Sequence, residues 1–428
     1  MTDSQKQEVA ISDNSLLLIS GVARKAARTG ALAGAAITAT GMLSAAALST
    51  YFARQVVVPP SRPEENLKVF SVGYPVEPRR EDEHPSTITL NATPATRAPG
   101  EYGLYFDGGT HFAHLGEVLS YQPYEEKVVR RVISVESGNL SKIVRGRLSG
   151  VIARTPETAG YRAEEITLNL PVGEAPAWLV HPQASYRDYP QESTPKPSTT
   201  WAIMVHGMGV TRAETLRALE ATQSLGLTSL HISYRNDRDA PPSDDGRYGL
   251  GFTEWQDVDT AIEYALEHGA QDVVLFGWSM GGAISLQTMD RARHRRAIKA
   301  LVLDGPAIDW LQLIEYQTKY NRLPLRIGEL GVSMISKPAL NIFTGLKRPI
   351  ELSKMSWTRR PGDIRVPTLI LHSLDDTYVP ASSSQEIAMK SPLVDFIPFF
   401  GATHTREWNV DPQKWTNTVI DWLKIRLG

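Results

Sequence analysis

From about residue 164 onward, short apolar runs alternate with longer segments in which apolar residues recur every three or four positions. The short runs predict strands and the longer segments predict helices. The predicted strands are two within 165–180, joined by a turn at 171–173, and then 201–205, 228–234, 272–276, 300–303, 368–372 and 394–400. The predicted helices are 214–225, 255–269, 281–292 and 410–427. This order indicates an α/β domain over 164–428, with a mostly parallel, doubly wound sheet.

The alternation stops between residues 306 and 364, where the chain carries many large apolar residues but no strand pattern. The segment is too long for a simple connection between two strands. It predicts a helical cap inserted over the carboxyl edge of the sheet. The alternative is ordinary helical packing between two strands.

Upstream of the α/β region, β-type runs are separated by Gly and Pro, and no helical period is sustained. The runs are 67–72, 87–92, 128–135 and 142–148. They predict a small β-rich accessory region over 67–163, whose role the pattern does not indicate. A Pro-rich linker over 54–66 is expected to precede it.

The first residues form a polar tail, 1–28, which ends in Arg24, Lys25 and Arg28. The following stretch, 29–53, has no charged residue and is long enough for a membrane-spanning helix. The basic residues before it predict a cytoplasmic N-terminus, with the α/β domain outside the cell membrane. A cleaved signal peptide, which would make the protein secreted, and an Ala-rich helix of a cytoplasmic protein are the alternatives.

Composition excludes several classes of protein. The 428 residues carry a net charge of −2 and include no cysteine. Disulfides, cysteine nucleophiles and thiolate metal sites are therefore ruled out. The chain has no basic stripe interleaved with aromatic residues, which is the pattern that would indicate nucleic-acid binding. His111 and His114 have H-x-x-H spacing without a third ligand pattern, so we expect neither a metal nor another cofactor.

The most informative motif is Gly277-Trp278-Ser279-Met280-Gly281, which fits G-x-S-x-G. A predicted strand precedes it and a predicted helix follows it, which is the context that this motif requires. The sharp turn would raise the Ser279 hydroxyl above the sheet edge. Ser279 is therefore the predicted nucleophile.

A serine hydroxyl needs a base to take its proton. His404 lies in the loop between the last predicted strand and the last predicted helix, where loops converge on the nucleophile, so it is the predicted base. His294 lies in an Arg-rich stretch and His372 at a strand end, and both are less suitable. The acid should follow strand 368–372, where two neighbours, Asp375 and Asp376, compete. The one that is not the acid would cap the turn or the next helix.

An oxyanion hole is predicted from the residues after strand 201–205, which are His206, Gly207, Met208 and Gly209. We expect the backbone N–H groups of Met208 and Met280 to be the two donors, with Gly209 behind the first. His206 is expected to brace this loop rather than to act as a second base.

Together these residues resemble the α/β-hydrolase superfamily over about 164–428. In that family the aspartate of a D-x-x-V-P pattern is the triad acid, and here the pattern is formed by Asp376, Val379 and Pro380, which favours Asp376 over Asp375. The elbow GWSMGG is similar to that of serine aminopeptidase and monoacylglycerol-lipase-like hydrolases. The run over 233–265 resembles membrane-anchored actinobacterial hydrolases of unassigned substrate. Dehalogenases and epoxide hydrolases of this fold need Asp where this chain has Ser279.

These features predict a serine hydrolase that cleaves a carboxylic ester through an acyl-enzyme. The apolar cap favours a small-molecule or lipid-like ester as substrate. A peptidase, an amidase or an acyltransferase would use the same residues. The remaining alternative is a non-catalytic envelope binding module of the same fold.

Overall fold

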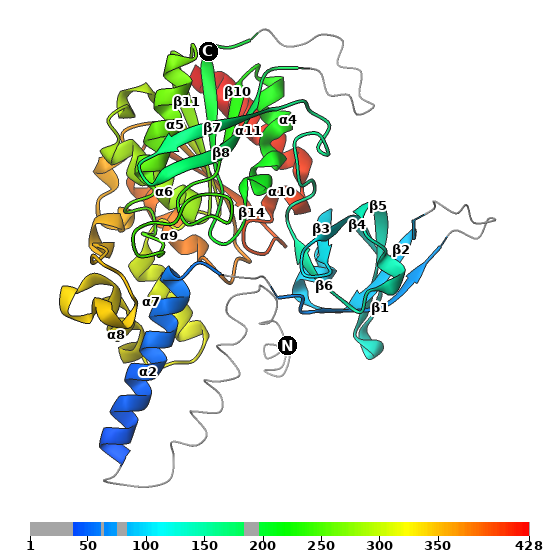
Figure 1. The fold of residues 1–428 in the computed structure, drawn as a ribbon, viewed down its shortest axis with the longest axis horizontal. Coiled ribbons are helices and arrows are strands. Elements are labelled where there is room, and N and C mark those ends of the chain that lie inside the picture. Colours follow the sequence, from blue (N-terminus) through cyan, green and yellow to red (C-terminus); the bar gives the residue numbers. More distant parts are fainter. Residues whose placement is uncertain (1–36, 61–63, 75–83, 184–196, 428) are drawn as a thin grey trace.

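The computed structural model describes residues 37–60, 64–74, 84–183 and 197–427. Within these ranges the chain forms a long helix, a small closed barrel and a larger α/β domain (Figure 1). The helix comes first in the sequence and lies against the α/β domain, whereas the barrel lies to one side of that domain.

The α/β domain is built on an eight-stranded sheet with the order β14-β13-β12-β11-β9-β10-β8-β7. The six strands from β9 to β14 pair in parallel, and β8 and β7 continue the sheet in antiparallel fashion beyond β10. The strands are β7 (Glu164–Leu170), β8 (Gly173–Val180), β9 (Thr200–Val205), β10 (Thr228–Ile232), β11 (Asp272–Trp278), β12 (Ile298–Asp304), β13 (Thr368–Ser373) and β14 (Val394–Phe399).

Helices cover both faces of this sheet, because the central strands are apolar on both sides. In β9, Ile203 and Val205 belong to one buried cluster with residues of α5 and α6. Ala202 and Met204 belong to a second cluster with residues of α4 and α11. The helices are α4 (Leu219–Ser224), α5 (Trp255–Glu267), α6 (Met280–Arg291), α9 (Ala381–Lys390), α10 (Glu407–Val410) and α11 (Pro412–Leu427).

Two predicted helices differ in detail from the observed ones. The segment predicted as helix 214–225 begins as a 3₁₀ helix, Arg212–Ala218, and becomes α-helical only in α4. The predicted helix 410–427 is divided into α10 and α11 at Pro412, which has no N–H to continue the first helix. Asp411 then caps the second helix by accepting a hydrogen bond from the Lys414 N–H.

The segment over 306–364 contains two helices followed by a series of 3₁₀ turns. The helices are α7 (Trp310–Tyr320) and α8 (Leu325–Ser336). Asp309 begins the first of them by accepting hydrogen bonds from the N–H groups of Leu311 and Gln312. Both helices contribute buried residues to the cluster that also contains α5 and α6, so this segment packs on the main domain.

The region from 67 onward forms a closed barrel of antiparallel strands in the order β1-β2-β5-β4-β3-β6. The strands are β1 (Leu67–Gly73), β2 (Thr87–Asn91), β3 (Tyr102–Phe106), β4 (His111–Gln122), β5 (Lys127–Ser137) and β6 (Arg145–Ser149). The sequence did not predict β3 and β4. The prediction of a strand from 142 was also wrong at its start, because Leu140–Lys142 forms a 3₁₀ turn capped by the Asn139 side chain.

The first described element is helix α2 (Ile37–Val57). The predicted linker over 54–66 was wrong at its start, because Arg54 to Val57 continue the helix. Ala53 and Val57 are buried, which explains why the helix extends this far. None of the helices in the described ranges combines the length and the apolarity needed to cross a membrane. The tail 1–28 and the start of the predicted anchor lie outside the described residues, and the extracytoplasmic location stays a prediction.

Candidate active site

Ser279 lies at the sharp turn between β11 and α6. Its backbone is strained, with φ 52° and ψ −114°. The turn is held on both sides, because the Ser279 N–H donates to the Asp304 carbonyl at 3.0 Å and its carbonyl accepts from the Ala307 N–H at 3.1 Å. A Cβ on Gly281 would lie 2.0 Å from the Val205 carbonyl oxygen, so only glycine fits there. The sequence thus folds this turn at the carboxyl end of a central strand.

The structure brings Ser279, His404 and Asp376 together in a hydrogen-bonded relay. The Ser279 hydroxyl donates to Nε2 of His404 over 2.8 Å. Nδ1 of the same imidazole donates to Oδ2 of Asp376 over 2.7 Å. His404 follows β14 and Asp376 follows β13, so each lies in a loop at the same edge of the sheet as Ser279. This order of nucleophile, acid and base along the chain is the one that the sequence predicts.

The Asp376 carboxylate is fully buried and has several donors. Its Oδ1 accepts the N–H groups of Tyr378 at 2.7 Å and Val379 at 3.0 Å. Its Oδ2 also meets Nε2 of His372 at 3.2 Å. Burial alone would raise the pKa of Asp376, but the charge of His404 and the hydrogen bonds from both imidazoles outweigh it and hold the pKa below its ordinary value. The acid therefore stays ionised at neutral pH.

For Asp375 the sequence left two tasks open, a cap of the turn or a cap of the next helix. Oδ2 of Asp375 accepts the Gly401 N–H at 2.7 Å, so it ties the loop that leads to His404. The helix that follows, α9, has Pro380 at its N-cap and no side-chain cap, so the expectation that Asp375 caps that helix was wrong. The sequence shows His372 only as a residue at a strand end. In the structure its imidazole contacts the Asp376 carboxylate.

The loop after β9 lies close to the nucleophile. A Cβ on Gly207 would be 3.3 Å from the Ser279 Cβ. His206 braces the loop, with Nδ1 at 2.8 Å from the Gly207 carbonyl and Nε2 at 2.7 Å from Asp237. Met208 lines the cavity beside Ser279. The Gly209 N–H donates to the Tyr248 hydroxyl at 3.3 Å, so it is directed away from a substrate.

Met280, the second predicted donor, is the first residue of α6. The N–H of a first helical residue has no carbonyl in a preceding turn to bond, and the helix dipole adds positive potential there. Met280 is fully buried, and it directly follows Ser279. Its backbone N–H therefore lies at the start of the helix beside the nucleophile, and its role as an oxyanion donor stays a prediction.

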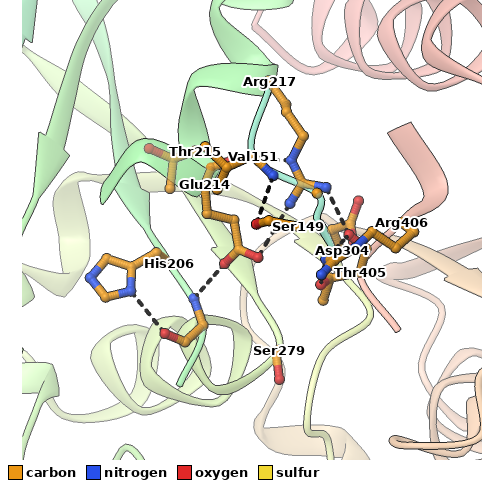
Figure 2. A network of polar contacts seen from close by, with 12 residues as sticks. Ser149, Val151, His206, Glu214, Thr215, Arg217, Ser279, Asp304, Thr405 and Arg406 are labelled. Atoms are coloured by element: carbon orange, nitrogen blue, oxygen red, sulfur yellow. Dashed lines mark hydrogen bonds and ion pairs between the residues drawn. The ribbon is translucent and has the colours of Figure 1, made fainter. Parts of the chain in front are cut away.

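A buried ionic network extends from the loop after β9 to Thr405 (Figure 2). Glu214 accepts the Gly207 N–H at 2.8 Å and pairs with Arg217 at 3.4 Å. Arg217 in turn donates to the Thr405 carbonyl at 2.7 Å and to Oδ1 of Asn409 at 2.8 Å. One guanidinium group thus joins the predicted oxyanion loop to the loop that carries the base. The sequence shows Glu214 and Arg217 only as polar residues of a predicted helix.

Two further carboxyl groups, Asp304 and Glu407, are buried next to this network. Burial raises the pKa of both. The effect is larger for Glu407, because it lies beside two other acids, whereas Arg217 stabilises the charge on Asp304. Oε1 of Glu407 accepts the Ser373 N–H at 2.7 Å, which fixes the end of β13 just before the acid loop.

A cavity of about 460 Å³ opens beside Ser279. The cap helices α7 and α8 supply one side of it, and residues 51–60 supply another. Its described lining is mainly apolar, and Arg54 is the charged residue in it. Elsewhere, His114 pairs with Glu101 at 2.9 Å. Within the described ranges no cluster of three His, Asp or Glu residues could hold a metal ion.

The fold and this site define an α/β hydrolase, in which a polar relay lies at the carboxyl edge of a parallel sheet. A model of the alpha/beta hydrolase family matches residues 202–418, which is half of the chain. The chain therefore belongs to the alpha/beta hydrolase family. A domain of unknown function (DUF8805) matches residues 79–149, which form most of the barrel.

Several solved structures resemble the chain. An esterase of Pyrococcus furiosus, Pf2001, is 16% identical over 64% of this chain and 96% of its own, with a TM-score of 0.47. Est1E from Butyrivibrio proteoclasticus is 15% identical over 61% and 98%, with a TM-score of 0.44. Alpha/beta hydrolase domain-containing protein 10 from mouse is 20% identical over 62% and 100%, with a TM-score of 0.45. No curated protein matches the chain, and the narrower resemblances to lipase-like and actinobacterial hydrolases stay predictions.

Proposed function

We propose that the protein is a serine hydrolase that cleaves carboxylic esters through an acyl-enzyme intermediate. The observation that carries this proposal is the continuous relay from the Ser279 hydroxyl through His404 to Asp376, which ends at the wall of an apolar cavity. Nucleophile, base and orienting acid within hydrogen-bond reach are the requirement for this chemistry.

In the first half of the reaction, the Ser279 oxygen attacks the ester carbonyl carbon while Nε2 of His404 takes its proton. The tetrahedral intermediate then expels the alcohol, whose oxygen receives that proton from Nε2. Asp376 keeps the imidazole in the required tautomer and stabilises its charged form. In the second half, His404 deprotonates a water molecule that attacks the acyl group, and Ser279 leaves with the proton.

The backbone N–H groups of Met208 and Met280 would stabilise the negative oxygen of each intermediate. The support for this assignment is the short approach of Gly207 to Ser279, the fixed Glu214 contact behind that loop, and the place of Met280 at the start of α6. A single donor of this kind contributes about 3–4 kcal/mol to the transition state.

The direct test is labelling with a fluorophosphonate probe, followed by kinetics with aryl esters. Wild-type protein should be labelled and should hydrolyse p-nitrophenyl acetate, whereas Ser279→Ala should do neither. Ser285→Ala is the matched control, because Ser285 lies on the same helix and, among the described residues, its hydroxyl donates to the Gly281 carbonyl. Persistent labelling of Ser279→Ala would refute the nucleophile assignment. Amide hydrolysis or acyl transfer would appear as activity on anilides or as transfer to an added alcohol in place of water.

A further inference from the structure

One wall of the cavity comes from an unexpected part of the chain. Residues 51–60, which precede the barrel in sequence, border the same cavity as Ser279. They comprise the last two turns of α2 and the extended residues that follow it. Figure 1 shows this helix running alongside α7 and α8, while the barrel lies elsewhere.

This segment is docked firmly on the hydrolase domain. Val57 is fully buried, and its carbonyl accepts the Tyr248 N–H at 2.8 Å. Ala53 is also buried, and it faces α8 at Gly331, where a Cβ would make an ordinary contact of 3.9 Å with it. Pro60 lies against Gly209 of the loop after β9, where a Cβ would approach its ring to 2.8 Å. The segment is therefore part of the site and not a connection passing over it.

The chemistry of the cavity indicates what it would bind. Phe52, Val56 and Val58 from this segment lie among the apolar side chains that α7 and α8 supply. The polar lining residues of α7 already have protein partners: the Thr318 hydroxyl donates to the Ile314 carbonyl at 2.7 Å, and Nε2 of Gln317 donates to the Thr377 carbonyl at 3.0 Å. Arg54 reaches the Thr344 carbonyl at 3.4 Å. Of the described lining residues, none is a carboxylate that would select a cationic substrate.

We propose that residues 51–60 form one wall of an acyl-binding subsite, so that the enzyme takes esters of aliphatic acids and this wall sets the preferred chain length. The inference rests on the proposed function, and it names the substrate class of the same site. A concave, mostly apolar cavity with the nucleophile at its edge is suited to an acyl chain whose carbonyl remains at Ser279. Each methylene that enters should raise kcat/KM by about threefold to fourfold until the cavity is filled.

The test uses the full-length protein and p-nitrophenyl esters from acetate to dodecanoate. Val58→Trp fills the cavity and should lower kcat/KM for octanoate at least tenfold while acetate changes less than twofold, which moves the optimum to shorter chains. Phe52→Ala enlarges the cavity and should move the optimum to longer chains. Val144→Trp is the matched control, because Val144 is 74% exposed in the barrel and should leave the profile unchanged.

The two variants are expected to shift the optimum in opposite directions, which a merely structural segment would not produce. Equal losses for all esters, acetate included, would overturn the proposed subsite, as would a flat chain-length profile of the wild type. A different result would contradict the proposed function itself: wild-type protein that shows no Ser279-dependent hydrolysis of any ester, including p-nitrophenyl acetate. Thermal melting of each variant shows whether it is folded. If Val58→Trp does not fold, the chain-length profile of Phe52→Ala still tests the proposed subsite.

Discussion

Arg217 donates a hydrogen bond of 2.7 Å to the main-chain carbonyl oxygen of Thr405, the residue that follows His404. Thr405 has a φ of 52°, which is unfavourable for a β-branched residue. Such a conformation persists only where the surroundings impose it. Arg406 donates to the same carbonyl at 3.1 Å, so two cations hold the turn that orients the predicted base.

Arg217→Lys should therefore reduce turnover without weakening substrate binding. A lysine keeps the charge but cannot bond both the Thr405 carbonyl and Asn409 in the planar geometry of a guanidinium. We expect kcat to fall by about 10- to 100-fold, as for a base displaced by up to 1 Å, with KM within about threefold. Steady-state kinetics on an aryl ester would measure both constants.

Arg212→Lys provides the control for this experiment. Arg212 belongs to the same 3₁₀ helix and is also buried, but it pairs with Glu165 and stacks on Trp178. Its replacement should leave kcat near the wild-type value. Unchanged kcat in Arg217→Lys, or an equal loss in both variants, would contradict a specific role of Arg217 in positioning the base.

The two neighbouring aspartates should respond very differently to the same substitution. Asp376→Asn removes the charge that the imidazole of His404 needs and favours the wrong tautomer, so kcat should fall about 10⁴-fold. Asp375→Asn should retain most of the activity, since an amide oxygen can still accept the Gly401 N–H. Comparing kcat for both variants at pH 8 tests the choice of Asp376. A large loss in Asp375→Asn alone would reverse it.

Glu407 is expected to make the stability of the protein dependent on pH. Its pKa is raised in the folded state, so its contribution is fully present below the ordinary value of about 4.3 and is lost as pH rises through the raised value. In that window the fold loses up to about 1.4 kcal/mol per pH unit, because unfolding releases the proton. Glu407→Gln has no proton to release, and its amide oxygen can still accept the Ser373 N–H.

The difference in unfolding free energy between Glu407→Gln and wild type should therefore grow in favour of the variant from pH 5 to pH 8, by more than about 1 kcal/mol. Denaturant unfolding at several pH values would measure it. Asp395→Asn, which replaces a partly exposed carboxylate on β14, is the control and should give a nearly constant difference. A constant difference for Glu407→Gln would mean that Glu407 is ionised in the fold.

The strand order accounts for the meeting of Ser279, Asp376 and His404, because each follows a strand of the parallel sheet and the carboxyl ends of such strands lie at one edge. The preference for Asp376 over its neighbour came from the family resemblance and not from the strand pattern. The sequence was insufficient for β3 and β4, since β4 pairs with its neighbour through several register shifts that break the period of two. Arg217 has the pattern of an exposed helical residue. Its burial comes from contacts with residues 405–409, and the Thr405 partner lies 188 positions later in the chain.

The wall over 51–60 was missed for a related reason. Its apolar residues continue an uncharged stretch, which predicts insertion into a membrane as readily as packing on a protein surface. Only the contacts with Tyr248 and with α8 distinguish the two, and both partners are distant in sequence. Local patterns identify what a segment can bury, but they do not identify the surface against which it is buried.

The last prediction concerns Asn409, which joins the barrel to the active-site network. Its Nδ2 donates to the carbonyl oxygens of Glu101 at 2.7 Å and Gly150 at 2.9 Å, and its Oδ1 accepts from Arg217. Asn409→Asp preserves the size of the side chain and the oxygen that accepts from Arg217. It replaces the Nδ2 donor by a carboxylate oxygen, which then lies opposite the carbonyl oxygens of Glu101 and Gly150. An unsatisfied buried contact of this kind costs about 1–3 kcal/mol, and more when it is charged. We therefore expect a lower melting temperature and a lower kcat.

Asn139→Asp is the matched control, since Asn139 is exposed in the barrel and its side chain accepts a hydrogen bond from the Ser141 N–H, which an aspartate can also accept. That variant should keep both the melting temperature and kcat. If Asn409→Asp lowers the melting temperature but leaves kcat unchanged, the barrel only stabilises the fold. If both fall together, the barrel also helps to hold the loop that carries His404, because Asn409 and Thr405 are fixed by the same guanidinium group.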